Sequence, residues 1–202
     1  MGENFIGPGE LGRIRDALGI RAPTTVQPGI PLIPYGNDLL DQSSRSHILI
    51  LGAPSAFDGS PLTINKMRSF HGTDPSRKEP CFYNQDWYLG ELFAKDVVLR
   101  PGWYLIGKYL LEPSRGKEPA TKKTKTKLPS AVLACFAFFA YYFQSGGQKL
   151  WDHDYIWCSD VDHNGDQIYV GKYTDPSGIN KSGFNIHRHL KIKDNYGCID
   201  LF

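Results

Sequence analysis

Oxygen-bearing side chains alternate in one acidic stretch in the last quarter of the chain. They belong to Asp160, Asp162, Asn164 and Asp166, and Gly165 allows a sharp turn among them. Carboxylate and amide oxygens at this spacing suit a hard cation such as calcium. The same residue types also form an ordinary polar turn between two strands. The stretch is therefore interpreted either as a calcium site or as a solvated hairpin turn.

This acidic stretch departs from an EF-hand loop. An EF-hand carries a bidentate glutamate at position twelve, and here that position holds Gly171. The flanking runs also predict strands, whereas an EF-hand loop joins two helices. A calcium site at this place would therefore be a looser one, built from the four oxygen-bearing side chains alone.

Histidines are the second group with a spacing that suits chemistry. His187 and His189 are separated by one residue, so a strand would place both imidazoles on the same face. Two neutral imidazoles on one face hold zinc if a third ligand approaches, for which Cys158, Asp160 and His153 are candidates. This pattern indicates a metal-dependent hydrolase that uses His187, His189 and the acidic stretch. Separate surface histidines are the alternative interpretation.

Aromatic and amide side chains are mixed in the segment 81–88. Rings that stack and polar tips that orient a ligand suit the recognition of a sugar or a peptide. Tyr83 and Asn84 are therefore candidate ligand-binding residues, together with Tyr169 and Tyr173 in a later strand-like run. Trp87 is interpreted instead as a core residue of a helix.

Known catalytic motifs are missing from the sequence. It contains no G-x-S-x-G elbow and no glycine-rich phosphate loop. The chain has 23 Lys and Arg against 21 Asp and Glu, a near balance that argues against a protein built to bind nucleic acid. The lysine-rich loop 112–127 is interpreted as a solvated loop. We therefore expect a non-enzymatic module that binds a protein or carbohydrate ligand and is stabilised by calcium if the acidic stretch is a site.

Length and composition indicate one soluble domain. The chain has 202 residues, of which 41% are hydrophobic, enough to bury a substantial core. The four cysteines include no CxxC pair, and the first residues lack the pattern of a signal peptide. We expect a cytoplasmic or virion-associated protein without structural disulfides, and the sequence leaves open whether Cys135 and Cys198 meet. The apolar run 131–143 is too short to cross a bilayer and predicts a buried helix.

Periodicity and turn residues predict an α+β fold, with helices early and an antiparallel meander late. The N-terminal part, 1–35, is expected to hold a helix and an extended proline-rich arm, and 36–202 to form a single α+β domain. The expected helices are 10–18, ended by Gly19, then 60–70, 84–94 and 131–143. In the second of these, Leu62, Met67 and Phe70 are expected to point inward. The expected strands are 47–51, 103–106, 155–158, 167–174, 183–189 and 197–202.

Four prolines force an extended path on residues 21–35. Such a segment is either a linker or an arm laid across a neighbouring surface. Ile30, Leu32 and Ile33 favour packing against another surface. The arm therefore suggests a homo-oligomer and, as a further alternative function, a structural protein of a virion or assembly.

Short motifs in about the last 75 residues carry a resemblance to a known fold. In order they are Leu128-Pro-Ser-Ala131 before a helix, Tyr155-Ile-Trp-Cys-Ser-Asp160, Tyr169-Val-Gly171, Asn185, and a terminal strand through Tyr196-Gly-Cys-Ile-Asp-Leu-Phe202. This order resembles the C-type-lectin-like fold, in the version of formylglycine-generating-enzyme-type domains and of variable proteins of diversity-generating retroelements. The resemblance implies a C-type-lectin-like C-terminal half, packed on helices, that contacts its partner through loops. It implies no catalytic or sugar-binding residue, because the lectin Glu-Pro-Asn and Trp-Asn-Asp motifs are missing. The chain also resembles uncharacterised proteins from uncultured bacteria, which implies nothing about activity.

Overall fold

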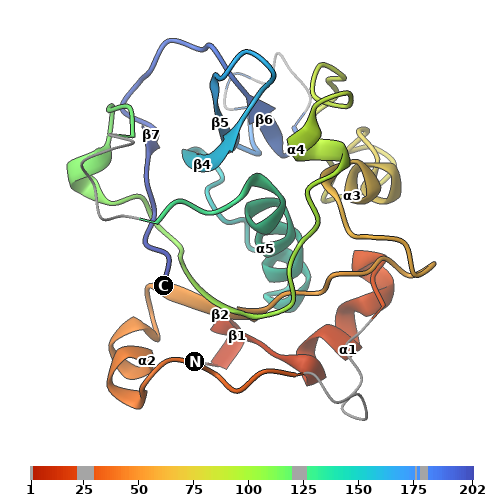
Figure 1. Cartoon of the computed structure of the whole chain (residues 1–202), viewed down its shortest axis with the longest axis vertical. Coiled ribbons are helices and arrows are strands. Elements are labelled where there is room, and N and C mark those ends of the chain that lie inside the picture. Colours follow the sequence, from red (N-terminus) through yellow and green to blue (C-terminus); the bar gives the residue numbers. More distant parts are fainter. Residues whose placement is uncertain (1, 22–29, 120–126, 176, 178–181) are drawn as a thin grey trace.

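The computed structural model describes residues 2–21, 30–119, 127–175, 177 and 182–202. Within them the chain is an α+β protein with five α-helices and two mixed sheets, of three and four strands (Figure 1). The α+β fold class is therefore confirmed. In chain order the elements are η1 (Gly2–Asn4), β1 (Phe5–Ile6), α1 (Pro8–Leu18), α2 (Asn37–Ser43), β2 (His47–Leu51), α3 (Ile64–His71), α4 (Leu92–Lys95), β3 (Trp103–Gly107), η2 (Glu112–Ser114), α5 (Ala131–Gln144), β4 (Tyr155–Val161), β5 (Gln167–Gly171), β6 (Asn185–His187) and β7 (Tyr196–Gly197).

The helix α5 is the centre of the molecule and lies between the two sheets (Figure 1). Every residue from Ala131 to Tyr141 is buried, as expected of a helix that is apolar all round. Two groups satisfy its first backbone N–H groups. Ser130 Oγ accepts from Leu133 N at 3.3 Å, and Asp160 Oδ2 accepts from Ala131 N at 2.6 Å. Among the described residues, no helix has the length and apolar character needed to span a membrane.

The first sheet has the order β1-β2-β3 and lies against one side of α5. The strand β2 is buried at all five positions and pairs antiparallel with β3, and strands were predicted at both places. The two-residue strand β1 adds a parallel edge and was not expected. Ile6 on β1 and Leu11 on α1 belong to the same core as α5, so the N-terminal helix is part of the main fold.

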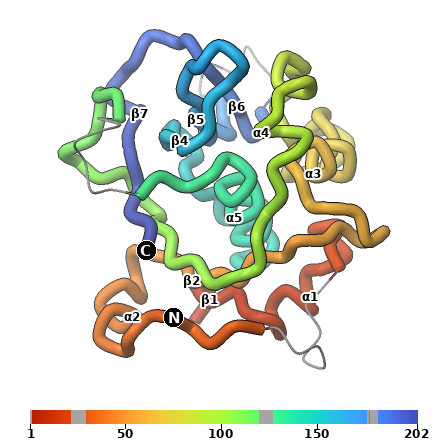
Figure 2. The backbone as a smooth tube through the Cα atoms, in the orientation of Figure 1, coloured from red at the N-terminus to blue at the C-terminus, as the bar shows by residue number. Residues whose placement is uncertain are grey.

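The second sheet has the order β6-β5-β4-β7. The strands β4, β5 and β6 form an antiparallel meander, which agrees with the sequence prediction. The last strand departs from it, because β7 runs parallel to β4. After β6 the chain crosses the end of the sheet to the opposite edge (Figure 2). There β7 runs in the same direction as β6 and β4. The expected all-antiparallel meander is therefore wrong for β7.

This sheet has two different faces. Ile156, Ile168 and Ile186 point to the core around α5. The opposite face, here called the aromatic face, carries a separate cluster of buried rings. Its members are Tyr155, Trp157, Tyr169 and Tyr196.

Two predicted helices differ in the structure. The helix α3 starts at Ile64 after its cap Thr63, and Phe70 is 39% exposed where an inward position was expected. In the predicted helix 84–94, only α4 is helical. The side chains of Gln85 and Trp87 instead donate hydrogen bonds to the carbonyl of Ile186 on β6, at 2.6 and 3.2 Å. These long-range bonds hold the segment in turns.

The proline-rich arm lies partly outside the described residues, because 22–29 are not among them. The described part, 30–35, packs on the same chain. Trp103 Nε1 donates to Pro31 O at 2.7 Å, and the hydroxyl of Tyr35 lies 2.7 Å from the carbonyl oxygen of Phe202. Leu32 is 92% exposed, in contrast to the packed position that its apolar character suggested.

Candidate functional site

The acidic stretch forms the tip of the β4–β5 hairpin. Asp162 Oδ1 accepts from the backbone N–H groups of Asn164 and Asp166, at 2.8 and 2.9 Å. Its Oδ2 forms an ion pair with the guanidinium of Arg188. The Asp162 side chain is fully buried. The hairpin turn is thus organised around one carboxylate whose counter-ion is an arginine of the same chain.

Hydrogen bonding determines the charge of Asp162. Burial raises the pKa of this carboxyl, but the two backbone N–H groups and Arg188 outweigh burial and hold the pKa below its ordinary value. Asp162 is therefore ionised at neutral pH. Both of its oxygens already have partners.

The four predicted oxygen ligands do not converge on one point. Asp160 points to the start of α5 and accepts from Ala131 N, and burial raises the pKa of its carboxyl. Asn164 is exposed, and its backbone N–H donates to Asp162. Asp166 pairs instead with His189, with 3.2 Å between Oδ2 and Nε2. Of the three predicted carboxylates, Asp162 and Asp166 have oxygens within 4.8 Å of one another.

A second pair of charges adjoins this hairpin tip. The exposed His163 places Nδ1 2.6 Å from Glu91 Oε1, and its backbone N–H donates to the other oxygen of Glu91 at 3.0 Å. Arg188 lies 3.7 Å from Glu91 and stacks over the ring of Trp87 at 4.5 Å. Arg188 thereby connects the hairpin tip with the segment before α4.

Two groups of side chains could hold a metal ion among the described residues. One is Glu91, Asp162 and His163, and the other is Asp162, Asp166 and His189, each with ligand atoms within 4.8 Å of one another. His187 belongs to neither group. The strand β6 ends at His187, and His189 has a φ of 61°, so the two imidazoles do not share one strand face as expected.

A polar hollow of about 410 Å³ opens beside the hairpin tip. We call it the acidic hollow, because two carboxylates, Glu118 and Asp166, line it. Gln167 and His189 add an amide and an imidazole, and Tyr169 also lines the hollow. The remaining lining residues are Pro119, Trp157, Gly165, Leu190 and Ile192.

A smaller polar hollow of about 180 Å³ lies on the other side of Leu190, which lines both. We call it the donor hollow. Its walls come from β4, from β6, from the segment after β5 and from the segment 81–88. It is lined by Tyr83, Tyr155, Lys172, Tyr173, Thr174, Asp175, Asn185, His187 and Leu190.

Three of the four predicted ligand-binding residues line these two hollows. Tyr83 and Tyr173 line the donor hollow, and Tyr169 lines the acidic hollow. Asn84 is exposed and lines neither. The sequence analysis missed Lys172, which follows the β5 strand directly.

The burial of these tyrosines limits what their rings offer. Tyr169 and Tyr173 are buried, so they do not offer open ring faces to a ligand. The hydroxyl of Tyr169 accepts from Leu190 N at 2.8 Å, and that of Tyr173 accepts from Cys81 N at 3.3 Å. Polar tips therefore dominate both hollows.

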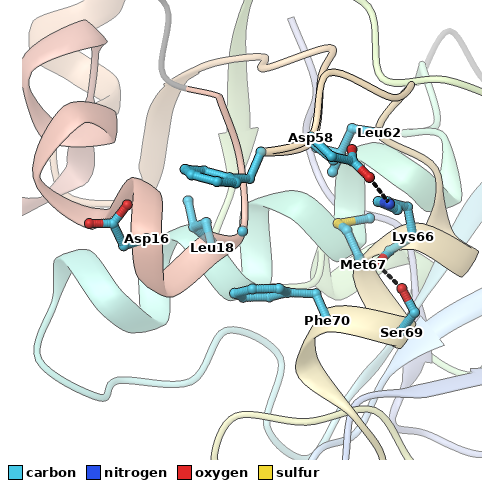
Figure 3. A pocket seen from close by; sticks show the side chains of 11 residues that line it. Asp16, Leu18, Asp58, Leu62, Lys66, Met67, Ser69 and Phe70 are labelled. Atoms are coloured by element: carbon cyan, nitrogen blue, oxygen red, sulfur yellow. Dashed lines mark hydrogen bonds and ion pairs between the residues drawn. The ribbon is translucent and has the colours of Figure 1, made fainter.

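An apolar cleft of about 460 Å³ lies far from these hollows, between the end of α1 and α3 (Figure 3). Leu18, Met67 and Phe70 point into it, and the ion pair of Asp58 and Lys66 lies at its edge with 2.5 Å between Oδ2 and Nζ. This cleft is suited to an apolar group.

All four cysteines are buried and carry free thiols. Cys135 lies in the main core and Cys198 in the aromatic cluster, so the two are in different parts of the interior. Burial raises the pKa of Cys135 and Cys158 well above the ordinary value, which keeps these thiols protonated and unreactive.

Comparison with known proteins gives no assignment, because no family model, no curated protein and no solved structure matches this chain.

Proposed function

We propose that this protein is a non-enzymatic binding module that recognises a carbohydrate or protein ligand through its C-terminal loops. The observation that supports this most is the pair of polar hollows that share Leu190 beside the aromatic face. Their walls come from loops at strand ends, where binding residues are commonly placed on a rigid scaffold. The buried sheet and α5 below them provide that scaffold.

The acidic hollow favours a ligand rich in hydrogen-bond donors. The carboxylates of Glu118 and Asp166 accept from hydroxyl or ammonium groups, and such bonds are stronger than those between neutral groups. His189 both pairs with Asp166 and lines the hollow. Sugar hydroxyls and the side chains of lysine or arginine have the matching chemistry.

We further propose a C-type-lectin-like arrangement for the C-terminal half. It is supported by the order of α5, the β4–β5–β6 meander and a terminal strand, β7, that returns to β4. An experimental structure that gives residues 127–202 a different strand order would contradict this proposal.

The binding proposal is tested with neutral mono- and disaccharides and with short peptides containing lysine or arginine. Isothermal titration calorimetry should detect at least one ligand. Asp166→Asn should weaken it about tenfold, as expected when a charged acceptor is lost. Asp41→Asn on the exposed side of α2 is the control with the same charge change and should leave affinity unchanged. If nothing in the panel binds, or if Asp166→Asn binds as tightly as the original chain, the acidic hollow is not the site.

A metal-dependent hydrolase is the second candidate, favoured by the grouping of Asp162, Asp166 and His189. It requires the metal to compete with Arg188 for Asp162. It predicts zinc or manganese at near one equivalent in protein purified without chelators. A stabilising metal at about 100 times its Kd adds about 2.7 kcal/mol to the free energy of unfolding.

Thermal melts with calcium, with zinc and with EDTA separate the metal alternatives. A shift with zinc that His189→Ala removes supports the hydrolase. A shift with calcium alone supports a calcium-stabilised binding module. Equal melting temperatures under all three conditions, with no bound transition metal by elemental analysis, would exclude both.

A further inference from the structure

The donor hollow gathers hydrogen-bond donors. Its lining residues include Lys172, Tyr83, Tyr155 and His187, whose side chains carry an ammonium group, two hydroxyls and an imidazole. An imidazole carries at least one ring N–H whether it is neutral or protonated, so His187 offers a donor at this hollow. The donor hollow is therefore lined by several residues whose side chains donate hydrogen bonds.

Lys172 is the charged member of this set, and hydrogen bonds hold its backbone in place. Its backbone N–H donates to Trp151 O at 3.0 Å and to Asp154 O at 2.8 Å. Its carbonyl accepts from Asn185 Nδ2 at 2.7 Å. The residue has a φ of 41°, which is unusual for a side-chain-bearing residue and is retained where the surroundings fix it.

The Lys172 ammonium has no ion-pair partner within the part of the chain that the structure describes. The carboxylate that also lines the hollow belongs to Asp175, whose Oδ1 accepts from Ser177 N at 3.1 Å and from Ser177 Oγ at 2.7 Å. Asp175 is thus occupied by its own turn. The positive charge of Lys172 is then available for a ligand.

The ring of His187 is also held in place. It stacks on Tyr169 with 6.4 Å between ring centroids and an angle of 20°, and it meets the edge of Tyr155 at 6.1 Å. A preorganised donor loses little conformational entropy when a ligand binds. The donor hollow therefore combines a charged side chain on a fixed backbone with an imidazole held between aromatic rings.

We propose that the donor hollow is an oxyanion-binding subsite, which takes a carboxylate, phosphate or sulfate group through Lys172, Tyr83 and His187. Because Leu190 lines both hollows, the rest of the same ligand would extend into the acidic hollow. This second step rests on the proposed function and makes the ligand an acidic carbohydrate, with its anionic group on Lys172 and its hydroxyls on Asp166.

The oxyanion subsite is tested with three probes on the full chain: inorganic phosphate, glucuronate and glucose. Binding is followed by the imidazole resonances of His187 in NMR titrations and by calorimetry. Phosphate and glucuronate should shift the His187 resonances, because His187 lines the hollow that would hold the anion. Glucose should bind the acidic hollow and leave the His187 resonances at the donor hollow nearly unmoved.

Two lysine variants make the matched comparison. Lys172→Gln keeps the aliphatic stem and should weaken phosphate and glucuronate about tenfold, as expected for the loss of a charged donor. Lys191→Gln removes the same charge from an exposed position that lines neither hollow and should change affinity less than about twofold. Circular dichroism and unfolding curves of both variants show whether each still folds. If Lys172→Gln does not fold, two other measurements provide the test. They are phosphate binding by Tyr83→Phe and the phosphate titration of the original chain followed by the His187 resonances.

The outcomes separate this inference from the proposed function. If phosphate binds through Lys172 while Asp166→Asn leaves glucuronate affinity unchanged, the oxyanion subsite holds and the extended ligand is wrong. If neutral sugars bind through Asp166 while Lys172→Gln and Lys191→Gln behave alike, the binding module holds and the oxyanion subsite is wrong. Glucuronate that loses affinity in both Asp166→Asn and Lys172→Gln would support a single ligand across both hollows. Phosphate binding without glucuronate binding would identify a phosphorylated ligand.

Discussion

At the scale of single residues, Asp162 explains why an acidic repeat need not hold a metal. Its carboxylate accepts two backbone N–H groups and faces Arg188, so a cation from the same chain balances its charge. The alternate spacing of oxygens indicated a calcium ligand set. The contact with Arg188 joins residues 26 positions apart, so no short sequence motif reveals it.

Arg188→Met should strongly destabilise the protein. It leaves the Asp162 carboxylate buried without its counter-ion, and breaking such a pair costs about 3 kcal/mol or more. Urea unfolding at pH 7 measures the change. Arg13→Met, which breaks an exposed pair with Glu10, should cost less than about 1 kcal/mol. Equal stability of the two variants would show that Arg188 does not neutralise a buried charge.

His71 should make the protein sensitive to mild acid. Both ring nitrogens are buried without a hydrogen-bond partner in the described residues, and the ring stacks on Phe139 at 4.0 Å. Burial, assisted by the charge of Lys78, lowers the pKa of His71 from 6.5 to about 3. As the pH falls, the unfolded chain therefore takes up a proton at His71 before the folded chain does. The contribution of the neutral imidazole to the free energy of unfolding is fully present above pH 6.5 and is lost as the pH falls toward 3. The contribution lost between pH 7 and pH 5 is about 2 kcal/mol.

Unfolding of His71→Phe at pH 7, 6 and 5 isolates this effect, because the other titrating groups stay in place. The variant should lose about 2 kcal/mol less than the original chain over that range. If phenylalanine is too large for the site, His71→Leu serves the same purpose. Parallel stability curves for the original chain and both variants would contradict a buried neutral imidazole.

The candidate site shows which residue properties are visible in a sequence. Tyr83, Tyr169 and Tyr173 were expected at a site because aromatic residues at strand ends often bind ligands. Lys172 was not expected at the site, because lysines are common next to strands. Its value for ligand binding depends on whether its charge has a partner. Whether a charge has a partner is decided by tertiary contacts that no spacing reveals.

At the scale of elements, continuous apolar runs correctly predicted helices and strands. Short segments, and segments held by long-range hydrogen bonds, were not predicted correctly. The strand β2 and the helix α5 were predicted because their side chains are almost all apolar, which is typical of buried elements. The two-residue strand β1 is too short to show a period. The segment 84–94 has helical character but is held in turns by bonds to Ile186, so tertiary contacts override its preference.

The β4–β5 hairpin should depend on Gly171. This residue has a φ of 130°, and a Cβ added to it would lie 2.3 Å from the carbonyl oxygen of Asp154. Gly171→Ala should therefore cost about 3 kcal/mol or prevent folding, since the clash is with backbone. Gly165→Ala at the hairpin tip is the control. It shares a positive φ of 87° but meets no atom within 4 Å, so it should cost only about 1 kcal/mol.

Chemical denaturation followed by far-UV circular dichroism compares the two glycine variants. The difference between them measures the steric clash separately from the backbone strain that both share. If Gly165→Ala were the more destabilising, the close approach of Gly171 to Asp154 would not describe the hairpin.

At the scale of the whole molecule, one core connects the N-terminal helix with the C-terminal sheet. Ile6, Leu18 and Ile199 belong to the same buried cluster around α5. Removing residues 1–35 would therefore take away core residues as well as the arm. The hypothesis that the arm mediates assembly is better tested by Leu32→Ser in analytical ultracentrifugation, because Leu32 is exposed and its change leaves the core intact.

The shared core predicts a single cooperative unfolding transition. Two tryptophans report on opposite ends of the molecule: Trp103 on β3 in the first sheet and Trp157 on β4 in the second. With 5-fluorotryptophan incorporated, ¹⁹F NMR in a urea series should show both resonances lose native intensity at the same midpoint, as two-state unfolding requires. Ile6→Ala, at the far edge of the first sheet, should cost about 2–5 kcal/mol and move both midpoints equally. If the Trp103 resonance disappeared at a lower midpoint than that of Trp157, the two sheets would unfold as separate units and α5 would not couple them.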